Sequence, residues 1–114
     1  MRKLTLYRER ALACFALKYH YFIGQDFSSV KDDIENDKNA METWLDDPNA
    51  LRNGETRSIT LPDEDTSLVI AVITQERVLY SNVLLLPAAD GDISVRIVTD
   101  FNGDHRLRIY IESF

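Results

Sequence analysis

Apolar and polar residues alternate along most of this 114-residue chain with a period of two. In residues 3–8 the leucines Leu4 and Leu6 share one face, and the polar residues are expected on the other. In residues 14–23 the side chains at odd positions, from Phe15 to Ile23, also fall on one face. Because successive side chains of a strand point to opposite sides, both segments are predicted to be strands with one buried face. Helix is the competing interpretation for residues 11–17, since alanine and leucine favour helices.

Further strand-like segments occupy residues 56–61, 67–74, 78–86, 92–99 and 107–111. The segment 67–74 is almost continuously apolar, which is typical of a central strand buried on both faces. Turn residues separate these segments, and Asn102-Gly103 is a strong hairpin signal. About seven strands at this spacing predict a mainly β fold, an antiparallel β-sandwich of the Ig-like type.

The middle of the chain changes to a helical period over residues 29–46. Ser28 or Ser29 is a suitable N-cap, and acidic residues follow, where the positive end of the helix dipole favours them. The apolar residues that recur at helical spacing are Val30, Ile34, Met41, Trp44 and Leu45. Pro48 ends the pattern because it cannot donate a helical hydrogen bond. We therefore expect a single domain over residues 1–114, with one helical insertion at residues 27–50.

The predicted first strands resemble a known class of domain. Residues 3–8 (KLTLYR) followed by residues 14–24 (CFALKYHYFIG) look like the opening hairpin of small bacterial PEGA-like β-sandwich modules. Residues 51–55 (LRNGE) and 56–61 look like the next turn and strand of those modules, with residues 27–50 as an insertion. The Pro-Glu-Gly-Ala-type turn of that family is missing, and Pro62-Asp63-Glu64 stands in its place. The resemblance implies a non-catalytic accessory module and assigns no functional residue.

Composition and charge narrow the range of partners. Thirteen basic residues against nineteen acidic ones give a formal net charge of -6. An acidic chain without a concentrated basic patch is not expected to bind nucleic acid. No segment approaches the about 20 apolar residues of a membrane span, so no membrane insertion is expected. The single cysteine, Cys14, excludes an intrachain disulfide and fits a cytoplasmic protein. A lipoprotein-type signal is the alternative reading of the N-terminus, but residues 8–10 (RER) interrupt the apolar stretch that it needs.

One group of residues has the spacing of a calcium-binding loop. Asp100, Asn102 and Asp104 alternate as the first ligands of such a loop do. His105 stands where the loop needs glycine, however, and a hairpin turn explains the same residues. We therefore expect no metal site here. An enzyme that uses Asp100, Asp104 and His105 is the least favoured class of function.

Other catalytic or cofactor-binding patterns are weak. Cys14 and His20, in one predicted strand, would be about 20 Å apart, too far to act as nucleophile and base. The four glycines are isolated, so no glycine-rich phosphate loop is present. The sequence predicts neither enzymatic activity nor a cofactor.

The favoured function is a non-enzymatic interaction or accessory domain that binds a protein partner or a second copy of itself through a sheet surface or edge. The alternative is a small-ligand pocket between sheet and helix. The aromatic residues expected to line such a pocket are Phe15, Tyr19, Tyr21 and Trp44.

Three arginines near the end of the chain form a candidate partner-binding patch. Arg106 and Arg108 share a strand face, and Arg96 is expected nearby across the predicted hairpin. Such a patch would suit a carboxylate, a phosphate or an acidic helix of a neighbouring copy. An exposed sheet face whose charges prevent aggregation explains the same residues.

Overall fold

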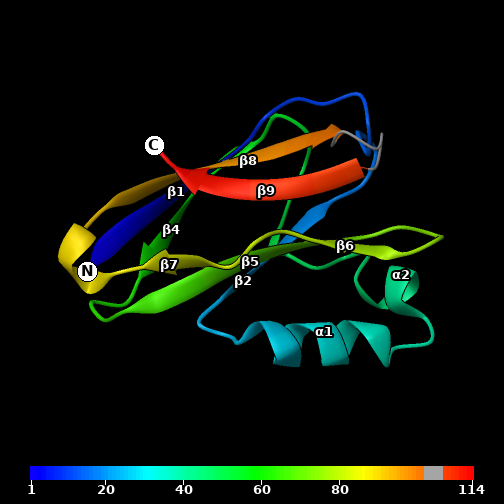
Figure 1. Cartoon of the computed structure of the whole chain (residues 1–114), viewed down its shortest axis with the longest axis horizontal. Helices are drawn as coiled ribbons and strands as arrows, with labels where there is room; N and C mark the ends of the chain where they lie inside the picture. Colours follow the sequence, from blue (N-terminus) through cyan, green and yellow to red (C-terminus); the bar gives the residue numbers. More distant parts are fainter. Residues whose placement is uncertain (102–106) are drawn as a thin grey trace.

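The computed structural model describes residues 1–101 and 107–114. Two sheets face each other, and two short helices lie outside the second sheet (Figure 1). The first sheet has the strand order β4 (Thr56–Leu61), β1 (Arg2–Arg8), β8 (Ile93–Phe101) and β9 (Leu107–Ser113). The second has the order β3 (Ala50–Leu51), β2 (Tyr19–Ile23), β5 (Thr66–Ile73) and β6 (Val78–Tyr80), and β7 (Leu84–Leu86) also pairs with β5. The described residues are therefore mainly β, as predicted, with nine strands where about seven were expected.

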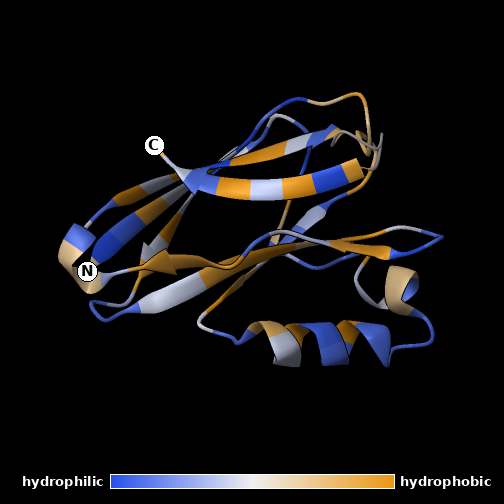
Figure 2. Ribbon diagram, in the orientation of Figure 1, coloured by the Kyte–Doolittle hydropathy of each residue, from blue (hydrophilic) through white to orange (hydrophobic). Residues whose placement is uncertain are grey.

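β5 separates two apolar clusters because it is buried on both faces, as its sequence predicted. Its even-numbered residues face the first sheet, in a cluster that includes Leu4, Leu6 and Val95. Its odd-numbered residues face α1 (Phe27–Glu35), in a cluster that includes Val30 and Ile34. Figure 2 shows the difference as apolar colour over most of β5 and alternating colours along β9. The main core thus lies between the sheets, and a smaller one lies beneath the helix.

One strand pair departs from the predicted antiparallel arrangement. β1 runs parallel to β8, with Leu4 opposite Ile93 and Leu6 opposite Val95. The other described strand pairs are antiparallel. The chain crosses from β7 to β8 at the end of the molecule where β1 begins, so both strands run in the same direction (Figure 1). The described sheets are therefore mainly antiparallel, with one parallel pair at the centre of the first sheet.

The predicted strand over residues 14–23 is wrong in its first half, because only Tyr19–Ile23 forms β2. Cys14 adopts a left-handed φ of 58°, and the N–H of Leu17 donates to the C=O of Cys14 at 3.0 Å. These features make a turn, so the alternative helix over residues 11–17 is wrong as well. The chain leaves the first sheet after Arg8 and enters the second at Tyr19, and alternation alone does not reveal this change of sheet.

The single helix predicted over residues 29–46 is also corrected. α1 ends at Glu35, and a second short helix, α2, covers Ala40–Thr43. Asp26 is the N-cap of α1 in place of Ser28 or Ser29, since its carboxylate accepts a hydrogen bond from the Ser29 N–H at 3.0 Å. A carboxylate cap satisfies a backbone donor that the first helical turn leaves free.

The break between the helices has a local cause. The Asp37 side chain accepts a hydrogen bond from the N–H of Asn39 at 2.9 Å, and such local bonds compete with a continuing helix. The apolar residues of α1 are buried as predicted, whereas Met41 and Leu45 are exposed. The predicted apolar stripe therefore belongs to two separate segments. The predicted hairpin turn at Asn102-Gly103 lies outside the described residues, although β8 and β9 on either side of it do pair.

β1 carries a buried arginine at each end. Arg2 and Arg8 share the inward face with Leu4 and Leu6, and they are 6% and 0% exposed. The prediction that the polar residues of this strand lie opposite the leucines is therefore wrong for Arg8. A buried charge needs hydrogen-bond partners, and both arginines find them in backbone carbonyl groups, although the Nε of Arg8 has no partner among the described residues.

Arg8 holds the turn before β2 and the end of β3. Its guanidinium donates to the C=O of Leu17 at 2.7 Å, of Leu51 at 2.8 Å and of Cys14 at 2.9 Å. It also lies 3.4 Å from the centre of the Tyr19 ring, an arrangement that favours a cation. Burial lowers the pKa of Arg8, but a guanidinium stays protonated in proteins. The positive charge is therefore stabilised by the dipoles of the three carbonyl groups and by the face of the Tyr19 ring.

Arg2 holds the opposite end of the molecule in the same way. It donates to five backbone carbonyl groups at 2.7–3.2 Å, those of Pro62, Glu64, Leu86, Pro87 and Gly91. Within the described residues the chain crosses between the sheets four times, after β1, β3, β4 and β7. The acceptors of Arg8 belong to or border the first two crossings, and those of Arg2 belong to or border the last two. Two side chains of one strand therefore fix all four crossings.

Replacing Arg8 by methionine keeps most of the side-chain volume but leaves three carbonyl groups without a donor. We expect Arg8→Met to lower the free energy of unfolding by about 3 kcal/mol or more, because each buried acceptor left unpaired costs about 1–3 kcal/mol. Lys3→Met, on the exposed face of the same strand, is the matched control and should change stability by less than about 0.5 kcal/mol. Urea unfolding curves measure both, and equal effects of the two variants would contradict the role given to Arg8.

Candidate functional site

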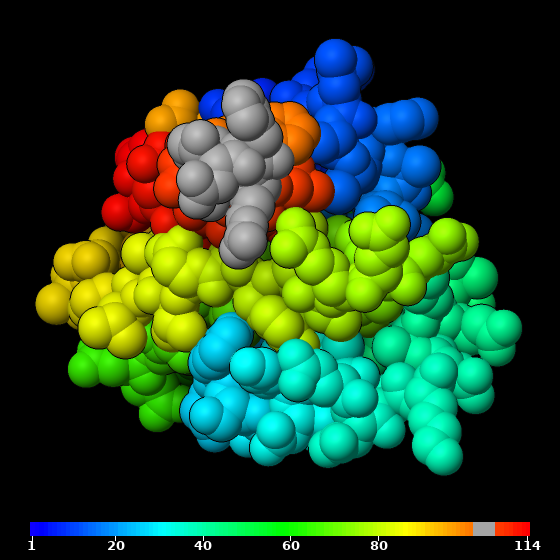
Figure 3. Space-filling model, turned by 45° about the vertical axis from the view of Figure 1, so that its right-hand side comes forward, coloured from blue at the N-terminus to red at the C-terminus, as the bar shows by residue number. Residues whose placement is uncertain are grey.

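The four edges of the two sheets differ in how they are protected. At the β9 edge, the side-chain amide of Asn82 accepts from the N–H of Ile111 at 2.9 Å and donates to the C=O of the same residue at 3.1 Å. At this residue the amide takes the place of a neighbouring strand, and β6 lies beside β9. Asn82 lies in the break between β6 and β7, and this break corrects the single strand predicted over residues 78–86. Figure 3 shows the segment that contains β6 and β7 lying directly against β9.

The edges of the second sheet are short or interrupted. β6 and β7 pair with different parts of β5, and Ser81 between them contributes its hydroxyl as acceptor for the Ile70 N–H at 2.9 Å. On the opposite side, β3 has two residues and follows Pro48 closely. Short or broken edges give an incoming strand few consecutive backbone groups to pair with.

β4 is an edge strand of six residues that pairs with β1 on one side. Beside the register pair Tyr7–Thr56, the N–H of Arg8 donates to the C=O of Glu55 at 3.0 Å. Hydrogen-bonded and non-hydrogen-bonded pairs alternate along an antiparallel ladder. The backbone groups of Thr56, Ser58 and Thr60 therefore point away from β1. Among the described residues, no loop or side chain forms a hydrogen bond to these outward groups.

The inward face of β4 lines a seam between the two sheets. Arg57 closes one end of it, donating to the C=O of Pro48 at 2.7 Å and to the Glu55 carboxylate at 2.7 Å. The other end opens into a cavity of about 340 Å³, whose lining includes Tyr21, Ile23 and Ile59. We call the outward backbone groups of β4 together with this cavity the β4 edge site. The sequence predicted the strand, but alternation does not show which strand has no outer neighbour.

The aromatic residues predicted to line a ligand pocket do not converge. Phe15 is 66% exposed in the turn before β2, whereas Tyr19 is fully buried between the sheets. The Tyr19 hydroxyl forms a hydrogen bond with Thr99 at 2.6 Å. Trp44 lies on the opposite face of β2, in edge-to-face contact with Phe22. Tyr21 and Trp44 are the two of the four that line one cavity, at the β4 edge site.

The predicted arginine patch is neutralised by neighbouring acids. Arg96 pairs with Glu112 on β9 and with Glu9 at 3.4 Å. Arg108 pairs with Asp100 at 2.7 Å across the same two strands. These ion pairs leave the outer face of the first sheet with alternating charges. Arg106, the third member of the patch, lies outside the described residues.

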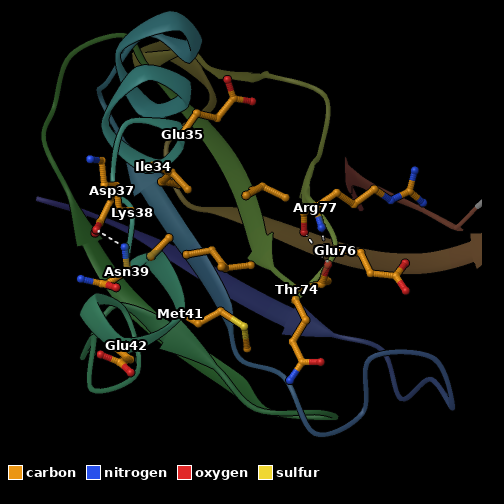
Figure 4. A pocket seen from close by; sticks show the side chains of 14 residues that line it. Ile34, Glu35, Asp37, Lys38, Asn39, Met41, Glu42, Thr74, Glu76 and Arg77 are labelled. Atoms are coloured by element: carbon orange, nitrogen blue, oxygen red, sulfur yellow. Dashed lines mark hydrogen bonds between the residues drawn. The ribbon is translucent and has the colours of Figure 1, made fainter.

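A groove of about 660 Å³ lies between the helices and the β5–β6 turn. Figure 4 shows its acidic residues, Glu35, Glu42 and Glu76 among them, pointing away from one another. In residues 1–101 and 107–114, no three potential ligand residues gather into a metal site. Asp104 and His105, from the calcium-loop and enzyme readings, lie outside the described residues. The groove therefore presents surface charge without a convergent chemical group.

The side chains of His20 and Cys14 lie on opposite sides of the second sheet. His20 is buried beneath α2, and its Nδ1 lies 2.8 Å from the Asp47 carboxylate. Cys14 packs against the core between the sheets, where burial raises the pKa of its thiol. A thiol with a raised pKa is a poor nucleophile at neutral pH. His20 and Asp47 therefore anchor the segment after α2, and Cys14 fills space.

In comparisons with known proteins, no family model, curated sequence or solved structure matches this chain. No helix among the described residues is long and apolar enough to cross a membrane.

Tyr80, the last residue of β6, makes a pH-dependent contribution to the stability of the fold. Its buried hydroxyl oxygen has no hydrogen-bond partner among the described residues, and burial together with the Glu35 charge raises its pKa to about 12. Because the pKa in the unfolded chain is about 10, this contribution is complete below pH 10 and is lost as the pH rises through 12. Burial also raises the pKa of Tyr19, so absorbance titration should show late phenols at both residues. Tyr80→Phe should remove one of them and reduce the loss of stability at high pH. A late-titrating absorbance that is undiminished in Tyr80→Phe would contradict the assignment.

Proposed function

We propose that this domain is a non-enzymatic interaction domain that binds an extended segment of a protein at the β4 edge site. An incoming strand would hydrogen-bond to the outward backbone groups of Thr56, Ser58 and Thr60, as in β-strand addition. The observation behind this proposal is the contrast between the open β4 edge and the other three: Asn82 and β6 cover part of the β9 edge, and the edges of the second sheet are broken or short. Exposed edges of ordinary domains are usually blunted, so an open one of six residues is a candidate binding surface.

The two faces of β4 indicate which side chains a partner strand should carry. Its outer face carries the exposed hydroxyl side chains of Thr56, Ser58 and Thr60, whereas its inner face offers half-buried Ile59 beside the seam cavity. A partner strand with alternating small polar and branched apolar residues fits both faces. In this proposal the domain is an Ig-like or PEGA-like sandwich, for which a non-catalytic accessory role is the expected one. A cytoplasmic location belongs to the same proposal.

Small-ligand binding remains a second candidate with less support. The seam cavity of about 340 Å³ is lined by Tyr21 and Trp44, two of the predicted aromatic residues. Ligand pockets usually combine an enclosed apolar wall with a few convergent polar groups. Phe15 and Tyr19 lie elsewhere, so half of the predicted lining is missing from this cavity. Strand addition uses the cavity as well, as a place for an apolar side chain of the partner.

A display library of random linear eight-residue peptides tests strand addition, with the domain used at low concentration. We expect selected peptides to protect the amides of Thr56, Ser58 and Thr60 from hydrogen exchange. Ser58→Pro removes one outward N–H without touching the β1 ladder, because proline is tolerated at the free side of an edge strand. It should weaken peptide binding at least tenfold, which corresponds to about 1.4 kcal/mol.

Ser58→Ala is the matched control, since it removes the hydroxyl and keeps the N–H. Peptide affinity for Ser58→Ala should equal that for the unmodified chain. Selected peptides that protect other amides, that bind Ser58→Pro unchanged, or that fail to emerge at all would each contradict the proposal. Unfolding curves of both variants separate a loss of binding from a loss of fold.

A further inference from the structure

We propose that the partner of β4 is the β4 strand of a second copy of this chain, paired antiparallel about a two-fold axis at Ser58. This inference rests on the proposed function and names its partner. The two four-stranded sheets would join into one continuous sheet of eight strands. A two-fold interface needs a surface that is complementary to itself, and β4 meets that condition in its backbone, its side chains and its charges.

The backbone register is the first requirement. With Ser58 opposite Ser58 of the partner subunit, Thr56 lies opposite Thr60 of the partner subunit, and the reverse pair follows by symmetry. All three residues direct their N–H and C=O groups outward, so each of these pairs exchanges two hydrogen bonds. Moving the axis by one residue to Ile59 would place Thr56 opposite Pro62 of the partner subunit, which has no N–H to donate. The axis at Ser58 therefore uses every outward group of the strand.

The side chains agree with the same register. On the outer face the pairs are threonine with threonine and serine with serine, and cross-strand hydroxyl pairs of this kind stabilise sheets. On the inner face Arg57 lies opposite Ile59 of the partner subunit, so the two Arg57 charges are offset. An axis at Arg57 would place these charges directly opposite each other, which is destabilising. The register that completes the backbone ladder is thus also the one that avoids this repulsion.

The charges along the edge are balanced locally. Arg57 is paired with Glu55 within its own chain at 2.7 Å, and the other side chains of β4 are uncharged. Each copy nevertheless carries a formal charge of -6, so two copies repel each other at long range. Salt screens this repulsion but leaves the backbone ladder intact. The dimer should therefore become tighter as ionic strength rises.

Sedimentation velocity over a protein concentration series reaching about 1 mM tests the pairing. The series extends to this high concentration so that a weak dimer is detected. Weak association is expected because pairing of a six-residue edge buries less surface than the about 1,600 Å² of typical stable interfaces. We expect a reversible dimer for the unmodified chain and for Ser58→Ala, with a Kd that falls as salt is added. Ser58→Pro should be monomeric throughout, with an unfolding midpoint close to that of Ser58→Ala.

Two results would overturn the inference. One is a monomer at every concentration and salt level, and the other is a dimer that Ser58→Pro leaves intact. If the chain stays monomeric while library peptides still bind at β4, the self-pairing fails and the proposed function stands. If the peptides fail as well, both are wrong, so the two experiments together separate the outcomes.

Discussion

Two guanidinium groups buried at the ends of β1 determine how the chain is arranged. Neither Arg2 nor Arg8 has a carboxylate partner among the described residues, and together they occupy eight hydrogen-bond contacts to backbone carbonyl groups. A charge in an apolar interior is costly unless hydrogen bonds compensate for the lost water. The carbonyl groups come from the connections that carry the chain between the sheets, so satisfying the two charges also fixes where every crossing lies.

This arrangement has a consequence for the edges of the sheets. β1 sits inside the first sheet, and the crossings that its arginines hold bring β4 to the outside of that sheet. Asn82 caps Ile111 at the far edge, where β6 lies beside β9, and the edges of the second sheet are too short or too interrupted for strand pairing. The proposed binding role therefore follows from the topology, because the same contacts that order the fold leave one strand with free backbone groups.

Alternation in the sequence was sufficient to predict most strands but few of their neighbours. Residues 56–61 form a strand as predicted, and residues 67–74 correspond to the doubly buried β5. The turn at Cys14 was missed because alternation does not show that the Arg8 side chain is buried and holds the carbonyl groups of the connection that follows β1. The site was visible only in part for the same reason. A strand with a polar outer face has the same sequence pattern whether or not another strand pairs with it. The identity of Asn82 likewise does not show that its side-chain amide bonds to the backbone of Ile111.

The most direct test of the central claim is the side-chain NMR spectrum of the arginines. If Arg2 and Arg8 hold the crossings through their carbonyl contacts, their guanidinium protons will exchange slowly with water and will be resolved from one another. Arg96 and Arg108, whose ion pairs lie at the surface, provide the comparison within the same spectrum and should exchange rapidly. Rapid exchange at Arg2 and Arg8, equal to that of the surface pairs, would contradict the account.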